Sequence, residues 1–223
     1  MGTLYLVRHG QASFGADDYD QLSDLGHRQS VRLGEYFAQR GLQFDLALRG
    51  TLRRHRETFD GICRGAGWGA REAMEQAGLN EYDSEAVIAA VHAGKLEKPA
   101  SPEEYRAHFR LLREGLTRWM NGQVQPLGMP PYAEWRAAIV SVLDAVLRST
   151  EGRVLLVSSG GPISTAVGHI LGTTAETTID LNMRIRNSSV TEFAFTPKRH
   201  MLVSYNTLPH LEAQGLDDWV TYA

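Results

Sequence analysis

The chain has 223 residues, with 23 Lys and Arg against 26 Asp and Glu, a formal net charge of -3 and a single cysteine. This length allows one large domain or two small ones and is ample for a buried core. The charge disfavours a nucleic-acid-binding protein with a basic face, because neutralising phosphates needs an excess of Lys and Arg. One cysteine excludes an intramolecular disulfide and a thiolate metal cluster, which favours a reducing cytoplasm.

The N-terminal sequence MGTLYLVRHG lacks the basic region and the long apolar run of a signal peptide. No later segment approaches the roughly 20 apolar residues that span a bilayer. We therefore expect a cytoplasmic protein without a membrane anchor. Since no repeat or linker rich in Pro, Gly or Ser divides the chain, we expect one domain over residues 1–223.

The first part of the chain alternates between two patterns. Short apolar, β-branched runs predict buried strands, and apolar residues at helical spacing predict helices. In chain order the predicted elements are a strand over 3–7, a helix over 23–40, a strand over 44–48 and a helix over 52–63. Such alternation indicates a parallel sheet with helices on its faces.

The middle of the chain, about 80–130, is less regular and predicts a helical cap insertion over the sheet. The later elements are predicted helices over 103–120 and 133–148, a strand over 154–157, a glycine turn opening a helix, and final strands over 190–195 and 201–205. The expected fold is a three-layer α/β/α sandwich with a mostly parallel central sheet and this cap.

Three groups of residues with possible chemistry lie where predicted strands end, which is where open α/β sheets bind ligands. Arg8 and His9 follow the first strand and offer a cationic fork beside a possible neutral nucleophile. The segment 50–58 (GTLRRHRET) places several arginines at a helix start. The segment 158–161 (SSGG) offers backbone amides at a helix N-terminus, which suits an anion. Together they could enclose a phosphate group.

These segments resemble those of the histidine phosphatase superfamily, also called the phosphoglycerate mutase-like family. The similarity extends from residue 4 to about 211 in the family's order. It rests on Arg8-His9-Gly10 after the first strand, on 50–58, and on 79–81 (LNE), 157–161 (VSSGG) and 186–193 (RNSSVTEF). The resemblance implies the phosphoglycerate mutase-like fold and a covalent phosphohistidine mechanism without a cofactor.

The resemblance also implies roles for individual residues. His9 would attack the phosphorus, and Arg8 and Arg54 would bind the phosphoryl oxygens. Arg54 is chosen over its neighbours because the family's second arginine stands four residues before the threonine, here Thr58. Glu81 would protonate the leaving group and then activate water, with Glu85 as its rival. The further residues expected at the phosphate or the substrate entrance are Gln11, Ser13, Ser159 and Gly160.

One departure from the family concerns position 159, where the usual second histidine is replaced by Ser159. Loss of one preorganised donor would cost about 100- to 1000-fold in rate if nothing replaces it. His169 and His210 are possible substitutes, although each is more simply interpreted as structural. The serine still offers one hydrogen bond, and the turn still offers its amides.

A second departure favours a phosphatase over a mutase, because Gln11 and Gly15 stand where the mutase pattern has glutamate and asparagine. Three alternatives remain: a phosphate-binding pseudo-enzyme, a phosphoglycerate mutase, and a serine hydrolase using Ser159. The last has Val157 where a nucleophile elbow needs glycine. No metal-binding motif is present in the sequence. The expected partner is a small phosphorylated substrate or a phosphoprotein, without nucleic acid or membrane, and the oligomeric state stays open.

Overall fold

The computed structural model describes residues 1–13, 20–94, 101–149, 152–212 and 215–222. Within these ranges six strands form one mixed sheet in the order β3-β2-β4-β1-β5-β6. Strands β3, β2, β4 and β1 run parallel to one another, whereas β5 pairs antiparallel with β1 and β6 pairs antiparallel with β5. The strands are β1 (Gly2–Arg8), β2 (Leu46–Arg49), β3 (Met74–Glu75), β4 (Arg153–Ser158), β5 (Val190–Thr196) and β6 (Arg199–Thr207).

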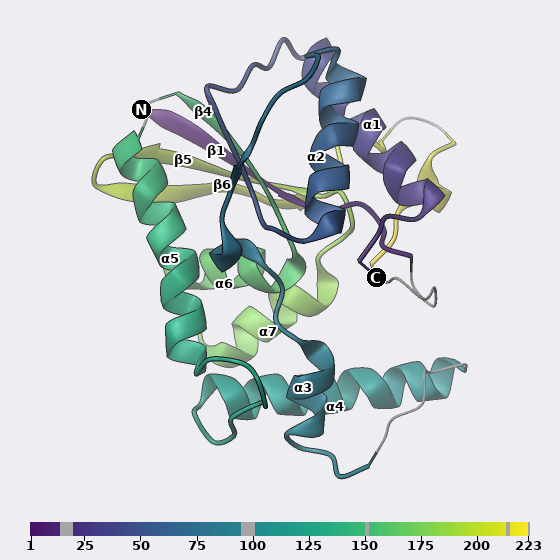
Figure 1. Cartoon of the computed structure of the whole chain (residues 1–223), viewed down its shortest axis with the longest axis vertical. Helices are drawn as coiled ribbons and strands as arrows, with labels where there is room; N and C mark the ends of the chain where they lie inside the picture. The colour runs from purple at the N-terminus through teal and green to yellow at the C-terminus, as the bar shows by residue number, and fades with distance from the viewer. Residues whose placement is uncertain (14–19, 95–100, 150–151, 213–214, 223) are drawn as a thin grey trace.

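Helices cover both faces of this sheet (Figure 1). Helices α1 (Asp24–Gln39) and α2 (Arg53–Ala66) lie on one face, and α5 (Tyr132–Ser149) and α6 (Gly160–Leu171) lie on the other. Because successive side chains of a strand point to opposite faces, Val7 of β1 packs toward α1 and α2 while Leu6 packs toward α5 and α6. The three-layer α/β/α sandwich predicted from the sequence is confirmed.

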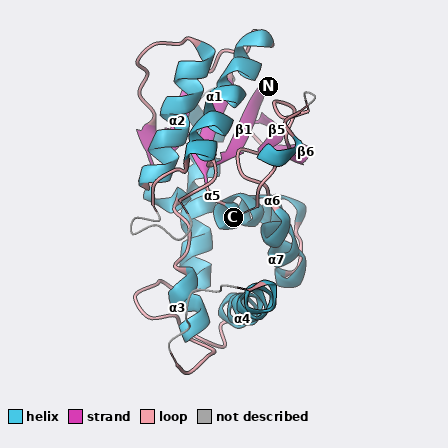
Figure 2. Ribbon diagram, turned by 90° about the vertical axis from the view of Figure 1, so that its right-hand side faces the viewer, coloured by secondary structure: helices cyan, strands magenta, loops and turns pink. Residues whose placement is uncertain are grey.

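Three further helices form a separate group below the sheet in Figure 1 and Figure 2. They are α3 (Ser84–Ala89), α4 (Pro102–Met120) and α7 (Ala175–Arg184), and their shared core includes Val87, Trp119 and Ile179. The cap expected over 80–130 therefore packs on α7 and on the start of α5, beyond the end of the sheet rather than over its face. Burial of its apolar side chains against α7 explains this position.

Capping side chains mark the starts of several helices. Ser23 and Thr174 accept hydrogen bonds from the first-turn amides of α1 and α7. Ser101 and Glu104 form a capping box at the start of α4, with Pro102 at its first position. Two short 3₁₀ helices, η1 (Ala77–Leu79) and η2 (Asp217–Trp219), complete the elements. None of the described helices is both long and apolar enough to cross a membrane.

Candidate active site

The sheet register brings the three chemical groups together. Strands β1 and β4 are parallel and adjacent, with Arg8 opposite Ser158, so His9 and Ser159 leave the sheet side by side. Strand β2 lies on the other side of β4, with Arg49 opposite Val157, and delivers the start of α2 to the same edge. The expected convergence at the carboxyl ends of these strands is thus present in the structure.

His9 is buried, and its ring is fixed by its own turn. Its Nδ1 lies 2.7 Å from the carbonyl oxygen of Gly10, so Nδ1 bears the hydrogen that is donated and Nε2 keeps its lone pair. Burial, followed by the charges of Arg54 and Arg8, keeps the pKa of His9 well below its ordinary value. His9 is therefore a neutral imidazole with a free nitrogen, which is the form that a nucleophile requires.

The turn that contains His9 is held from three sides. Its Gly10 amide donates to Oγ1 of Thr58 in α2 over 3.1 Å, and the Ser188 amide donates to the His9 carbonyl over 3.1 Å. A Cβ at position 10 would lie 2.4 Å from the carbonyl oxygen of Gly26, so only glycine lets α1 approach this closely. The packing of α1 and α2 thus fixes the position of the imidazole.

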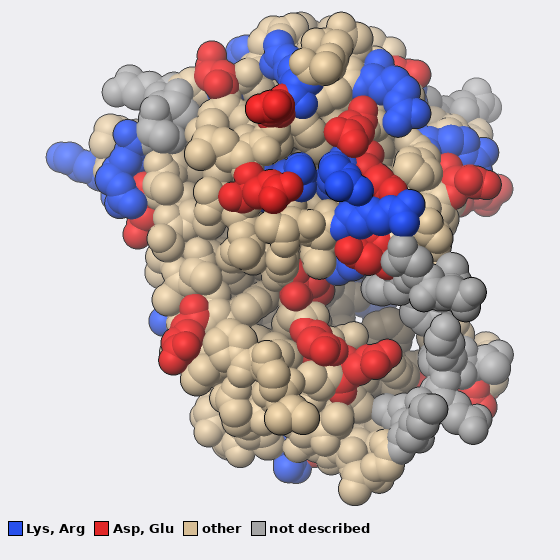
Figure 3. Space-filling view, in the orientation of Figure 1, with Lys and Arg blue, Asp and Glu red and all other residues tan. Residues whose placement is uncertain are grey.

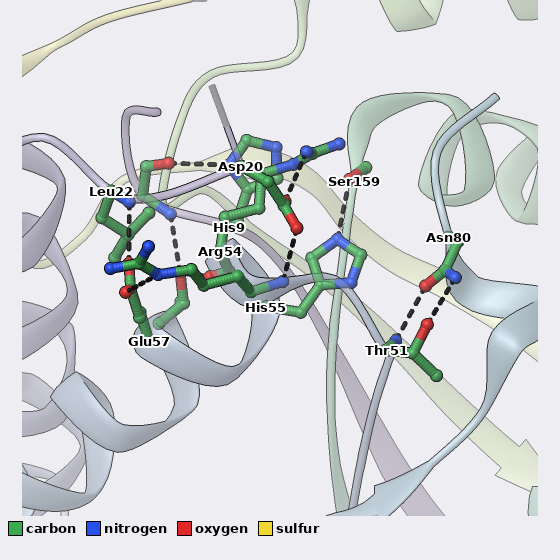
Figure 4. Close-up of polar contacts among 12 residues, drawn as sticks. His9, Asp20, Leu22, Thr51, Arg54, His55, Glu57, Asn80 and Ser159 are labelled. Atoms are coloured by element: carbon green, nitrogen blue, oxygen red, sulfur yellow. Dashed lines mark hydrogen bonds and ion pairs between the residues drawn. The ribbon is translucent and has the colours of Figure 1, made fainter. Parts of the chain in front are cut away.

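Two arginines lie beside this imidazole. Arg54 is 7% exposed and pairs through Nη1 with Oδ1 of Asp20 over 2.8 Å, as Figure 4 shows. Arg53 is exposed and pairs instead with Glu57, and Arg56 is also exposed. Of the four arginines in this helix, which include the exposed Arg64, only Arg54 therefore has a buried side chain near His9.

Arg8 reaches the site from β1. Its Nη1 donates to the carbonyl oxygens of Ile185 and Tyr222, each over 2.6 Å, so the chain after α7 and the C-terminal segment orient its guanidinium. Its charge contributes to the lowered pKa of His9 and counteracts the raised pKa of Glu81. Arg8 and Arg54, the two arginines expected to bind a phosphoryl group, are therefore both held in place by other segments of the chain.

Glu81 follows η1 and faces the first turn of α6. Its Oε2 accepts a hydrogen bond from the Gly161 amide over 3.1 Å. Burial raises the pKa of Glu81, and the Gly161 hydrogen bond and the charge of Arg54 counteract part of that rise. The rival Glu85 is exposed on α3. The geometry thus favours Glu81 as the carboxyl group of the site.

Two contacts that sequence reasoning missed position this carboxyl group. The hydroxyl of Ser158 donates to the Leu79 carbonyl over 2.7 Å, which joins the end of β4 to η1. Asn80 bonds Thr51 twice, through its side-chain oxygen to the Thr51 amide and through its side-chain nitrogen to the Thr51 hydroxyl. The two residues that precede Glu81 are thereby fixed to the end of β4 and to the turn between β2 and α2.

A buried histidine that sequence reasoning also missed lies against Ser159. Nε2 of His55 is 2.8 Å from Oγ of Ser159, and both residues are fully buried (Figure 4). The two substitutes considered for the missing second histidine lie elsewhere: His169 is exposed near the end of α6, and His210 bonds Ser188. The imidazole nearest to Ser159 therefore comes from α2.

The remaining predicted site residues make the following contacts. Oε1 of Gln11 accepts from the hydroxyl of Ser23, so this side chain is engaged at the start of α1, and Ser13 contributes a backbone bond to Gln21. Gly160 opens α6 next to Arg8. Gly15 lies outside the described residues. Within the described ranges, no group of three or more His, Cys, Asp and Glu side chains is arranged to hold a metal ion.

A small pocket adjoins Glu81 on the side of the cap. It is lined by Gly161 and by the aromatic side chains of Tyr82, Trp119, Tyr132 and Trp135. Figure 3 shows the surface hollowed between the upper part of the molecule and the cap, with acidic side chains at the edge of the hollow. The surroundings of Glu81 are thus aromatic, whereas those of His9 are cationic.

Comparisons of sequence identify relatives of this chain. Residues 4–208 match the model of the histidine phosphatase superfamily (branch 1). A 2,3-bisphosphoglycerate-dependent phosphoglycerate mutase of Chelativorans sp. (strain BNC1) is 36% identical over 88 residues, which are 37% of this chain and 43% of that relative. The corresponding mutase of Methylorubrum extorquens (strain PA1) is 33% identical over 86 residues, or 36% and 41% of the two chains. The matches span less than half the length of these curated relatives.

Solved structures share the fold. A phosphoserine phosphatase from Entamoeba histolytica in complex with 3-phosphoglyceric acid superposes with a TM-score of 0.67 at 20% identity, covering 95% of this chain and 100% of that chain. A mycobacterial glucosyl-3-phosphoglycerate phosphatase superposes with a TM-score of 0.65 at 19% identity, covering 92% and 98%. At this level of identity the superpositions establish the phosphoglycerate mutase-like fold.

Proposed function

Because the chain belongs to the histidine phosphatase superfamily, we propose that it is a phosphatase that hydrolyses phosphomonoesters through a covalent phosphohistidine on His9. The observation that supports this most directly is the state of that imidazole. It is buried and neutral, with Nδ1 engaged by Gly10 and Nε2 available. A fixed, unprotonated nitrogen at the edge of a cationic pocket is suited to attack phosphorus.

In the first step Nε2 of His9 forms a bond to phosphorus while the ester P–O bond breaks. Arg8, Arg54 and the amides that open α6 at Gly160 bind the phosphoryl oxygens and offset their charge in the transition state. In this proposal the substrate anion replaces the Asp20 carboxylate as the partner of Arg54.

Glu81 supplies the proton in this step. Its raised pKa favours the protonated carboxyl group, which donates to the leaving oxygen and releases the alcohol. The resulting carboxylate then takes a proton from water as that water attacks phosphorus and the N–P bond breaks. Phosphate leaves, and both His9 and Glu81 return to their initial states.

The organic part of the substrate is then expected on the Glu81 side, next to the aromatic pocket. Small phosphorylated compounds and phosphoproteins both remain candidate substrates. A cytoplasmic location and a reaction without metal are parts of this proposal.

A mutase is the second candidate, because curated relatives are phosphoglycerate mutases. A mutase returns the phosphoryl group to an organic acceptor, whereas a phosphatase transfers it to water. Interconversion of 2- and 3-phosphoglycerate in the presence of 2,3-bisphosphoglycerate, without net release of phosphate, would favour the mutase. A phosphate-binding pseudo-enzyme would bind vanadate and show no turnover across a broad panel of phosphomonoesters.

A serine hydrolase is the third candidate, since the Ser159 hydroxyl lies 2.8 Å from an imidazole. Two observations oppose it. Nδ1 of His55 has no hydrogen-bond partner among the described residues, whereas the base of a catalytic triad is oriented by a third group. The hydrolase also gives no role to Arg8 or Arg54. Labelling of Ser159 by a fluorophosphonate would favour this alternative.

The proposal is tested with a chromogenic phosphomonoester in the presence of EDTA. We expect turnover by the wild-type chain, a phosphoenzyme that is stable in alkali and labile in acid, and loss of both in His9→Ala. His169→Ala is the matched control, because this exposed histidine lies at the far end of α6. Unchanged turnover in His9→Ala would rule the mechanism out.

A further inference from the structure

Resting on the proposed phosphatase function, we propose that the Ser159 hydroxyl donates a hydrogen bond to the phosphoryl group and that His55 is the positioning residue that orients it. Together the two side chains would provide the neutral donor at the position where the family pattern has one histidine. The pair joins α2 to the start of α6, two segments separated by about a hundred residues in sequence.

The orientation of Ser159 is the first support. Ser159 is the N-cap residue of α6, yet its side chain makes no hydrogen bond to the amides of that helix in the described part of the chain. The N-cap side chains of α1 and α7 do make such bonds. An N-cap serine normally accepts from its own helix. The hydroxyl of Ser159 is instead turned to His55.

The direction of the hydrogen bond follows from the other ring nitrogen of His55. Nδ1 is buried and lacks a partner among the residues that the structure describes. A buried N–H without an acceptor is rarer and costlier than an unpaired lone pair, so the hydrogen belongs on Nε2. Nε2–H then donates to Oγ of Ser159, which leaves the hydroxyl proton of the serine for another acceptor.

The charge state of His55 supports the same direction. Burial, followed by the charges of Arg54 and Arg49, keeps the pKa of His55 well below its ordinary value. His55 is thus a neutral ring that polarises the serine without adding a positive charge. Its ring centre lies 5.8 Å from that of His9, which places the donor pair beside the nucleophile.

The acceptor that this proton meets is the substrate anion. Ser159 immediately precedes Gly160, and a Cβ at Gly160 would lie 3.7 Å from Nε of Arg8. The hydroxyl therefore belongs to the same cluster as the residues proposed to bind phosphate. An O–H that receives a hydrogen bond on its oxygen is a stronger donor through cooperative polarisation.

A double-mutant cycle tests the inference. We expect Ser159→Ala to lower kcat about 100-fold, as loss of a preorganised donor does. His55→Ala should lower kcat about 10-fold, since the hydroxyl remains but is no longer oriented. The double variant should match Ser159→Ala within about twofold, because His55 acts only through that hydroxyl. Inhibition by vanadate should weaken in the same order.

Further variants separate positioning from packing. His55→Gln keeps an N–H donor and should recover part of kcat, whereas His55→Phe fills the same space without a donor and should resemble His55→Ala. If His55→Ala does not fold, His55→Phe takes its place in the cycle. Ser30→Ala is the matched control, since it removes another buried hydroxyl, one bonded within α1, and should leave kcat unchanged.

Two results would overturn the inference while the wild-type chain remains active. The first is a Ser159→Ala variant that keeps wild-type kcat and vanadate affinity. The second is a cycle in which the two losses multiply, because His55 would then act independently of Ser159. A wild-type chain that neither turns over nor forms phosphohistidine would overturn the phosphatase proposal itself, and this inference with it.

Discussion

The backbone amide of Gly161 donates to Oε2 of Glu81 over 3.1 Å, so the first turn of α6 holds a carboxyl group that comes from a segment eighty residues earlier. The fit at this point is close. A Cβ at position 161 would lie 2.1 Å from Oε1 of Glu81 and 2.6 Å from the ring of Tyr82. A side chain at this position must displace both the Glu81 carboxyl group and the Tyr82 ring.

We therefore predict that Gly161→Ala lowers kcat about 100-fold by displacing Glu81, which removes general acid catalysis without changing the acid itself. Steady-state kinetics measure this loss, and thermal unfolding shows that the variant is folded. Combined with Glu81→Gln, the change should cost nothing further. Losses that multiply would mean that Gly161 acts in another way.

Glu81→Gln should separate substrates by their leaving group. An alkyl phosphate needs a proton on its leaving oxygen, and we expect its turnover to fall about 100-fold or more. An aryl phosphate with an acidic phenol needs no such proton, so His9 should still be phosphorylated. Rapid-quench measurements should then show a burst of phenol followed by slow turnover, because the attacking water lacks its base. Glu85→Gln, on the exposed side of α3, should behave as wild type.

Arg54 should not be replaceable by lysine. Its guanidinium is a planar fork that can contact two phosphoryl oxygens, whereas an ammonium group offers one point of charge. We expect Arg54→Lys to lower kcat/KM about 100-fold and to weaken vanadate binding. The exposed Arg56 in the same helix provides the control, and Arg56→Ala should keep wild-type kcat/KM. Equal effects of the two changes would contradict the assignment.

The pH profile of kcat/KM should be bell-shaped with its maximum on the acid side. His9 must be neutral, so activity is lost as pH falls through its pKa, which burial keeps below the ordinary 6.5. Glu81 must be protonated, so activity is lost as pH rises through its pKa, which burial holds above the ordinary 4.5. In Glu81→Gln the alkaline limb should flatten. Ionisation of the substrate affects both enzymes equally, so the difference between the profiles reports Glu81.

His210 should make the fold sensitive to acid. Burial, followed by the charge of Arg32, lowers the pKa of His210 from 6.5 to about 3. As pH falls, the unfolded chain therefore binds a proton at His210 before the folded chain does. With respect to this group, the free energy of unfolding is highest above pH 6.5 and decreases as pH falls toward 3. His210→Gln should reduce the slope of the unfolding free energy below pH 6.5 by up to about 1.4 kcal/mol per pH unit. Denaturant unfolding at several pH values measures this slope for the wild-type chain and for His210→Gln. An unchanged slope would contradict the prediction.

The order of the sandwich elements could be predicted from the sequence because their periodicities are local. The strand at 153–158 and the helix after it follow from an apolar run and a glycine turn. The sequence pattern does not indicate α7, because Thr177 and Thr178 lie in its first turns and its apolar residues cluster late. The predicted position of the cap over the sheet is wrong for the same reason, because the sequence pattern does not reveal α7 as its partner.

The proposed catalytic residues could be predicted from the sequence, whereas the contact of His55 could not. His9, Arg54 and Glu81 stand in short motifs, so their positions could be named before their geometry was known. The charged neighbours of His55 obscure it in the sequence, although His55, Phe59 and Ile62 lie at the spacing of one buried helix face. Its contact with Ser159 depends on how the starts of α2 and α6 come together where β2 and β4 end. No local sequence pattern encodes this arrangement.

The central position of β1 has a consequence for folding. This strand leaves the ribosome before its two partners, β4 at Arg153–Ser158 and β5 at Val190–Thr196, have been synthesised. Pairings so distant in sequence form late, because their loop-closure entropy must be overcome first. A nascent chain therefore has no ordered surroundings for His9, the proposed nucleophile. Substitutions that weaken β4 or β5 should then reduce the yield of active molecules and leave the turnover of each folded molecule unchanged.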